Sequence, residues 1–278
     1  MENHLPNMPE SISAMPDRYP RYFRLAEQTI HVVEEIGRMA RMVGGAILAL
    51  PSVHRSRRLV MEQMVRLGLE SMPLVVLISV FTGAVAAWQA AYQFQGWVPI
   101  RYLGSVIGKN VVVELGPVLT SLVVAGRIAA AMAAELGTMR VTEQIDALEA
   151  MGISPSRYLV MPRIVAATLM LPVLVIFADA LAIIGGFLVS NVLLDVSAHT
   201  FTMGLKRIFQ VRDVVAGLEK AAVFGMFMAI MGCHFGMNAQ GGAQGVGRAT
   251  TLAVVTACVC VLIGDYFLTT FLFPITGV

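Results

Sequence analysis

The chain has 278 residues, of which 57% are hydrophobic and only 14% are charged. Because about a quarter of the residues in an ordinary soluble domain are charged, this composition excludes most soluble classes and indicates a membrane protein. The net charge is +2, and the arginines flank apolar segments without interleaved aromatic residues, so nucleic acid is not an expected partner.

The first seventy residues divide into two segments. Residues 1–20 contain four prolines and few large apolar side chains, which predicts a disordered tail. From Phe23 to Ile47, apolar residues recur every three or four positions and charged residues fill the opposite face, which predicts an amphipathic helix. We expect the segment 21–70 to lie in the membrane interface with its arginines toward headgroups. The alternative is a helix that packs on a soluble partner.

Five apolar windows follow, and each is long enough for a membrane span, which takes about 20 helical residues. They cover residues 71–100, 111–134, 164–194, 221–247 and 249–278. We therefore predict an all-α integral membrane protein with a five-span domain over residues 71–278. The third window is longer than the hydrocarbon core requires, so we interpret it as one tilted helix.

The basic residues predict the orientation of these spans. With the N-terminus inside, the inner segments hold thirteen lysines and arginines and the outer loops hold five. The positive-inside rule then places the N-terminus in the cytoplasm and the C-terminus on the other side.

Ionisable residues inside the windows are the first candidates for a functional site, because a charge at the bilayer centre costs roughly 2.5–3.5 kcal/mol. Glu114 and Arg127 are thirteen residues apart, too far to pair within one straight helix. By charge, Lys220, Asp179 and Asp265 are candidates to pair with them. Either these groups line a polar substrate path or proton relay, or they pair between helices and fix the packing.

The sequence contains no convincing motif for a nucleotide-binding or metal-binding site. The segment LGSVIGKN, residues 103–110, is the nearest approach to a phosphate-binding loop, but Leu103 stands where the first glycine belongs and Asn110 where Ser or Thr would bind magnesium. We therefore expect no cofactor on this chain. The three cysteines fall inside predicted spans without a CxxC pair, which favours buried packing thiols over a metal site.

The segment RVTEQIDALEAMGISPSRYLVMPR, residues 140–163, separates the second and third windows. One helical stripe within it is apolar or small, made of Val141, Ile145, Leu148 and Gly152, with Met151 beside it. The other face is acidic, made of Glu143, Asp146 and Glu149. We predict a short cytoplasmic helix over about 141–152, with its start near Thr142 and its end at Gly152. Because an acidic face suits an anionic inner leaflet poorly, docking into a groove on a soluble partner is the better interpretation.

Residues 113–163, from VELGPVLTSL to SRYLVMPR, closely resemble the core of the MlaE (YrbE) permeases, which are membrane subunits of ABC transporters that move lipids between bacterial membranes. The matching elements are Glu114 to Pro117, Ala125 to Arg127, Glu135, Gly137, Met139, Glu143, Gln144, Met151, Pro162 and Arg163. Lys220 in EKAAVFG, and GRATTLAVV through Asp265, also resemble family positions. Val113 departs from the pattern, since several members carry arginine there.

The resemblance implies a homodimer of five-span subunits with an N-terminal interfacial helix in a bacterial inner membrane. It also implies cytosolic ABC ATPase subunits that bind ATP and Mg, an extracytoplasmic MCE-domain (MlaD-like) protein and a STAS-domain (MlaB-like) protein. The acidic helix would be the coupling helix, with the contact residues Val141, Glu143, Gln144, Ile145, Leu148, Met151 and Gly152. The substrate-cavity candidates are Glu114, Lys220, Arg127 and Asp265.

We therefore expect a permease subunit without catalytic residues, which moves phospholipids or related lipids between the inner membrane and the MCE-domain partner and contributes to outer-membrane lipid homeostasis. An ion-coupled secondary transporter that uses Glu114, Asp179 and Asp265 as a relay is the alternative, and it predicts inverted repeats. An intramembrane enzyme is disfavoured because no nucleophile and base stand at a usable spacing.

Overall fold

The computed structural model describes four stretches of the chain, residues 21–54, 56–94, 98–208 and 210–273. Every regular element within them is a helix, which confirms the predicted all-α class. The predicted tail, residues 1–20, lies outside the described residues, as do the side chains of residues 21–32.

Contacts divide the chain into two units, Met1–Gly44 and Gly45–Val278. The first unit contains most of α2 (Arg21–Ala49), which is one continuous helix, as its periodicity predicts. On its described turns the guanidinium of Arg38 lies 2.6 Å from the Glu35 carboxylate. That α2 lies in the membrane interface stays a prediction, and so do the segment boundaries at residues 21–70 and 71–278.

The second unit begins with the end of α2, continues through η1 (Leu50–Ser52) and α3 (Arg57–Leu69), and contains five described helical runs that are long and apolar enough to cross a membrane. The first run is α4 (Met72–Phe94), and the second joins η2 (Ile100–Tyr102), α5 (Leu103–Asn110), η3 (Val111–Leu115) and α6 (Gly116–Val141). The third joins η4 (Ser156–Val160) and α8 (Met161–Val192). The fourth is α10 (Val211–Met237), and the fifth is α11 (Gly242–Leu272). The chain is therefore a multi-pass membrane protein with the predicted five spans.

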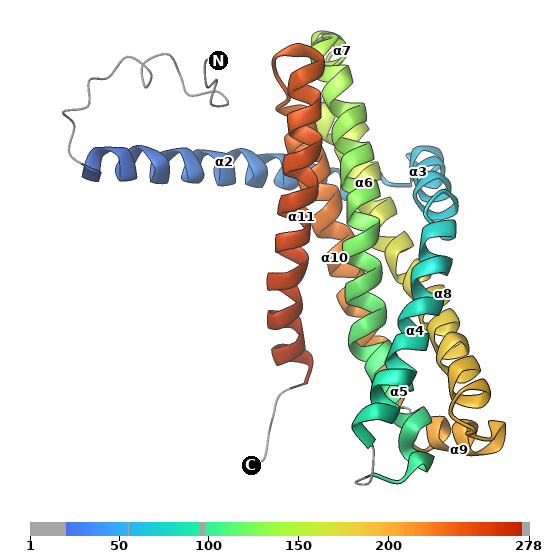
Figure 1. Cartoon of the computed structure of the whole chain (residues 1–278). Coiled ribbons are helices and arrows are strands. Elements are labelled where there is room, and N and C mark those ends of the chain that lie inside the picture. The colour runs from blue at the N-terminus through green and yellow to red at the C-terminus, as the bar shows by residue number, and fades with distance from the viewer. Residues whose placement is uncertain (1–20, 55, 95–97, 209, 274–278) are drawn as a thin grey trace. The chain divides into compact units, whose positions relative to one another are not determined.

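The spans run alongside one another, with α4 on α8 and with α6, α10 and α11 packed on one another (Figure 1). The short helix α7 (Gln144–Ala150) lies at one end of this bundle, and α5 and α9 (Ala198–Ile208) lie at the other (Figure 1). The third window is one continuous helical run, as predicted, and Pro172 lies inside it.

The fourth span differs from its predicted bounds, because α10 begins and ends ten residues before the window 221–247. The sequence interpretation kept charged residues out of the span, but Asp213 and Lys220 are both buried inside the helix. Each has an ion-pair partner within the chain, so the charges do not prevent the segment from crossing. The turn after α10 includes Gly241, whose φ of 83° suits glycine.

Small residues let the helix backbones approach closely. A Cβ at Gly232 of α10 would stand 2.9 Å from the Cβ of Met132 on α6, and one at Gly236 would stand 2.9 Å from the Cβ of Leu136. Gly83 of α4 likewise lies against the carbonyl of Ala182 on α8. On α6 the alanines that recur every four residues, Ala125, Ala129 and Ala133, are buried inside the chain, whereas the neighbouring Gly126 faces open space.

Candidate functional site

A fully buried lysine joins three membrane-spanning segments. Lys220 of α10 donates hydrogen bonds to Glu114 Oε2 at 2.7 Å and to Asp265 Oδ1 at 2.9 Å. Glu114 belongs to η3 and Asp265 to α11. The structure therefore brings together three of the four residues that the sequence suggests for a substrate cavity.

The exposure of these three side chains gives the cluster a buried end and an open end. The side chain of Lys220 is 0% exposed, that of Asp265 is 15% exposed and that of Glu114 is 42% exposed. A buried ammonium is tolerated only when anionic partners replace its hydration, and here two carboxylates do so. Since Lys220 is out of reach of a ligand, Glu114 is the member that a ligand can contact.

The backbone around Glu114 is held by the Glu-Leu-Gly-Pro sequence. The π-helical turn η3 ends at Gly116, whose N–H donates to the carbonyl of Val111. Pro117 occupies the first turn of α6, where its missing N–H costs little. A Cβ on Gly116 would collide with Asp179 Oδ1 of α8 and stand 2.9 Å from the Val111 carbonyl. A larger residue at this position would therefore have to displace the Asp179 side chain and shift the turn.

Asp179 does not join the cluster. It is buried on α8, and its Oδ1 has no hydrogen-bond partner among the described residues. Lys220 makes its two described ion pairs with the other two carboxylates instead. In the relay that an ion-coupled transporter would use, Glu114 and Asp265 are therefore linked through Lys220, but no described hydrogen bond connects Asp179 to them.

An open apolar cavity of about 540 Å³ lies between α4 and the start of α6. Leu115, which directly follows Glu114, contributes to its wall. The lining residues come from α4, η3 and α6 and are Leu77, Ile78, Phe81, Thr82, Val85, Ala86, Gln89, Leu115 and Leu119. This volume falls within the range of about 300–1,000 Å³ that is usual for small-molecule sites. With only Thr82 and Gln89 as polar members, the wall suits hydrocarbon.

Arg127, the fourth cavity candidate, lies elsewhere. Its guanidinium pairs with Glu70 and donates to Ser71 Oγ at 2.6 Å. Further along the same helix, Glu135 accepts from Arg66 at 3.0 Å and pairs with buried Arg163 at 3.1 Å. These two sets of contacts connect α3, α6 and α8 and have no described contact with the Lys220 cluster.

The short helix predicted between the second and third spans exists as α7, with changed details at its start; its coupling role stays a prediction. Its N-cap is Glu143 in the left-handed region, φ 60°, and not Thr142, whose hydroxyl instead donates to the Thr138 carbonyl at 2.8 Å. At the other end Gly152, φ 73°, donates to Glu149 and Ile153 donates to Leu148. This Schellman arrangement confirms the predicted stop at Gly152.

The predicted contact stripe of α7 divides into an inner and an outer part. Ile145 is 1% exposed and packs against its own chain, whereas Met151 is 66% exposed. Leu148 is half-buried, Val141 lies at the end of α6, and the remaining candidates Glu143, Gln144 and Gly152 are exposed. Ile145 therefore anchors the helix, and the exposed residues form the surface that is free to meet a partner.

Within the described part of the chain, no three His, Cys, Asp or Glu residues gather as metal ligands. Residues 103–110 form the regular helix α5 and not a phosphate-binding loop. Cys233 is a buried free thiol, and Cys258 and Cys260 are half-buried free thiols.

Known proteins are similar to this chain over most of its length. The sequence profile described as "Permease MlaE" matches residues 60–271. A probable ABC transporter permease protein of Rickettsia bellii is 37% identical over 253 residues, which are 90% of this chain and 97% of that protein. One from Synechocystis is 39% identical over 236 residues, 85% of this chain and 90% of its own length.

A plant protein is similar as well. The chloroplastic protein TRIGALACTOSYLDIACYLGLYCEROL 1 of Arabidopsis thaliana is 36% identical over 217 residues, 78% of this chain and 62% of that protein.

Proposed function

Because this chain belongs to the MlaE permease family and is an ABC transporter permease, we propose that its cargo is a phospholipid or a related lipid. The observation that carries this proposal is the position of the cavity. The hydrocarbon-lined space of about 540 Å³ has in its wall Leu115, the residue that follows the lysine-bound carboxylate of Glu114. An amphipathic ligand with acyl chains and a polar headgroup matches both parts.

Each part of the site has a distinct role in this proposal. Acyl chains occupy the apolar wall, where Phe81 and Leu119 exclude water from them. Glu114 meets the headgroup and, as a carboxylate, accepts hydrogen bonds from hydroxyl or ammonium groups. Lys220 holds Glu114 in place without touching the lipid, because it is fully buried. The Arabidopsis relative is named after a galactosylated diacylglycerol. This compound is an amphipathic lipid with a hydroxyl-rich headgroup.

The energy for transport comes, in this proposal, from ATP and Mg bound to separate ABC ATPase subunits. The exposed residues of α7 and of the turn after it, including Met151, dock on these subunits, while buried Ile145 ties α7 to the end of α6. Closure of the ATPases then moves α7 and α6 and narrows the cavity, since α6 carries Leu119 of its wall.

The assembly that we propose is a homodimer in a bacterial inner membrane, with its N-terminus in the cytoplasm and its C-terminus in the periplasm. An extracytoplasmic MCE-domain protein exchanges lipid with the cavity, and a STAS-domain protein joins the ATPases. With such a partner the transporter contributes to outer-membrane lipid homeostasis. The excess of basic residues on the α7 side of the membrane supports the orientation.

The substitution Ala86→Trp tests the proposal because it fills the cavity from α4. The matched control is Leu169→Trp, at an exposed position of α8 outside the cavity wall. Each variant is reconstituted with its ATPase and MCE-domain partners, and ATP-dependent transfer of a fluorescent phospholipid to acceptor vesicles is measured. We expect loss of transfer for Ala86→Trp alone. Unchanged transfer in a folded Ala86→Trp protein would contradict the proposal.

A further inference from the structure

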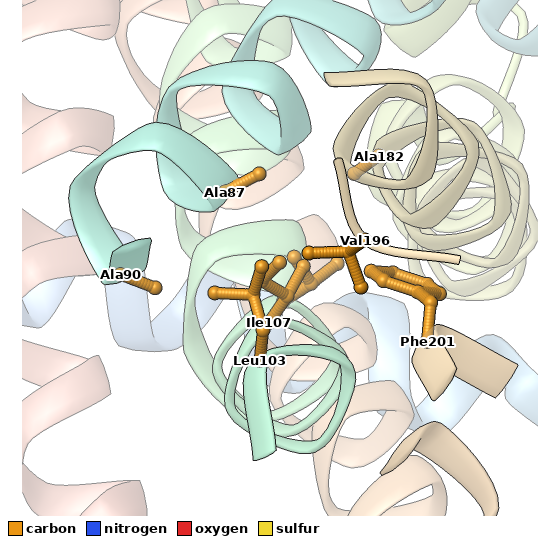
Figure 2. Close-up of a cluster of buried hydrophobic side chains, with 8 residues drawn as sticks. Ala87, Ala90, Leu103, Ile107, Ala182, Val196 and Phe201 are labelled. Atoms are coloured by element: carbon orange, nitrogen blue, oxygen red, sulfur yellow. The ribbon is translucent and has the colours of Figure 1, made fainter. Parts of the chain in front are cut away.

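The end of the bundle opposite α7 is a firmly packed platform. Ser105 Oγ of α5 donates to the Gly204 carbonyl of α9 at 2.5 Å, and Gly104 lies directly against the carbonyl of Phe201. Leu103 and Phe201 are both fully covered in the apolar cluster that α4, α5, α8 and α9 share (Figure 2). The short turn η2, just before α5, and the exposed face of α9 therefore keep a fixed relative position.

Two arginines meet at one tyrosine on this platform. The guanidinium carbon of Arg101 lies 5.1 Å from the centroid of the Tyr102 ring, and that of Arg207 lies 5.6 Å from the same centroid. Tyr102 is half-buried, both arginines are exposed, and Lys206 is exposed next to Arg207 on α9. The side chains of η2 and α9 thus concentrate positive charge around a single aromatic ring.

This charge is not balanced within the described residues. None of the described ion pairs involves Arg101, Lys206 or Arg207, although this end of the bundle does supply an acid for Lys109, whose Nζ lies 3.6 Å from Asp213 Oδ2. Like charges held close together repel, and a bound anion removes that repulsion. Guanidinium groups are also well shaped to bind phosphate oxygens through two hydrogen bonds at once.

The surroundings of the two arginines indicate where the anion comes from. Val98, before η2, and Ile100, its first residue, have exposed apolar side chains, and exposed Met203 lies on the same helix as Arg207. A tyrosine with cations and apolar neighbours at the end of a membrane span is typical of the headgroup region of a bilayer. We propose that Arg101, Tyr102 and Arg207 form a binding site for the phosphate of a phospholipid headgroup in the leaflet at the α5 and α9 end.

This site is separate from the proposed transport cavity, with which it shares no wall residue. The phosphate lies against the two guanidinium groups, and the acyl chains extend along the apolar surface of the spans. Binding at this site needs neither ATP nor a partner protein. If the chain binds no phospholipid here, the transport proposal is unaffected. If transport through the cavity is disproved, this headgroup site is unaffected.

The test compares two lipids that differ only in the headgroup. The full chain is purified in detergent, and its binding of dioleoyl phosphatidylglycerol and of dioleoylglycerol, which lacks phosphate, is measured by native mass spectrometry. Removing two charge-assisted contacts in R101Q/R207Q is expected to weaken phosphatidylglycerol binding about tenfold or more and to leave dioleoylglycerol binding unchanged. R101K/R207K keeps the positive charges but loses the paired N–H donors of the guanidinium groups. Its phosphatidylglycerol affinity should fall between those of R101Q/R207Q and the unmodified chain.

The control is Arg248→Gln, which removes one exposed arginine near the start of α11 and is expected to bind both lipids normally. Thermal unfolding checks that every variant is folded. Equal loss of both lipids in R101Q/R207Q, or no loss of either, would overturn the proposal. Displacement of phosphatidylglycerol by an equal concentration of inorganic phosphate would assign the site to free phosphate instead. A copurifying protein lost from R101Q/R207Q, with unchanged lipid binding, would assign it to a protein partner.

Discussion

Lys220 Nζ lies 2.7 Å from Glu114 Oε2, although the two residues are 106 positions apart along the chain. The contact joins α10 to the π-helical turn in front of α6, and Asp265 connects α11 to the same ammonium. Three membrane-spanning segments are therefore held together at one buried charge. The turn that carries Glu114 also carries Leu115 of the cavity wall, so this contact and the wall share η3.

The substitution Lys220→Met is expected to lower the thermal midpoint of the purified chain, because it leaves two carboxylates without their cation. Loss of one partner of a buried ion pair costs on the order of 3 kcal/mol or more. The triple variant K220M/E114Q/D265N removes the uncompensated charges and should recover most of that loss. If the single and triple variants unfolded at the same temperature, the cluster would not stabilise the bundle electrostatically.

The substitution Gly116→Ala is expected to reduce both stability and lipid transfer. The new methyl group would collide with Asp179 Oδ1 and crowd the Val111 carbonyl, which would displace the buried Asp179 side chain and distort the turn that positions Glu114. Gly126→Ala is the matched control, because a Cβ there meets nothing within 4 Å. It should be neutral or stabilise the chain by roughly 0.5–1 kcal/mol through its helix propensity. Equal effects at both positions, measured by thermal unfolding, would show that close packing at Gly116 is unimportant.

Two aspartate substitutions at α7 separate its anchor from its docking surface. Ile145→Asp places a charge in a buried position and is expected to destabilise the chain itself. Met151→Asp changes an exposed side chain and should leave thermal unfolding unchanged while it reduces copurification of the ATPase. Normal copurification with Met151→Asp would mean that the ATPase does not dock on this side of α7.

Glu135 and Glu62 allow a buried arginine contact to be compared with an exposed one. Glu135→Gln leaves Arg163, which is 5% exposed, without its carboxylate and should cost about 1–3 kcal/mol of stability. Glu62→Gln breaks an exposed pair with Arg58 and should cost less than about 0.5 kcal/mol. Chemical unfolding in detergent micelles measures both, and a larger loss for Glu62→Gln would contradict the structure.

The spans could be predicted from the sequence because long apolar windows leave few alternatives, and the stop of α7 could be predicted because Gly152 supplies a backbone conformation that other residues avoid. The true start of α10 could not be predicted from the sequence. Burying Asp213 or Lys220 in a membrane span appears unfavourable until the residue from another helix that pairs with it is known. The three members of the cluster were identifiable as charges in apolar surroundings. Their pairing was not, because it depends on which helices touch.

The cavity wall on α4 escaped prediction for a different reason. Phe81 and Val85 look the same in the sequence whether they face lipid or line a binding site. The same limit applies to α7, where Ile145 and Leu148 share a predicted stripe and only Ile145 is completely covered. Arg127 was grouped with the cavity residues because it is a charge inside a span, but its partner Glu70 comes from the end of α3.

Occupancy of the cavity by lipid is the central claim, and photocrosslinking tests it most directly. A photoreactive amino acid replaces half-buried Leu119 of the cavity wall, and in a separate variant it replaces exposed Leu169 of α8. Cells are illuminated, and adducts on the purified chain are identified by mass spectrometry. The account predicts a phospholipid adduct at Leu119 that Ala86→Trp abolishes, and an adduct at Leu169 that Ala86→Trp leaves unchanged. A lipid adduct at Leu119 that survives Ala86→Trp, or no lipid adduct there, would contradict it.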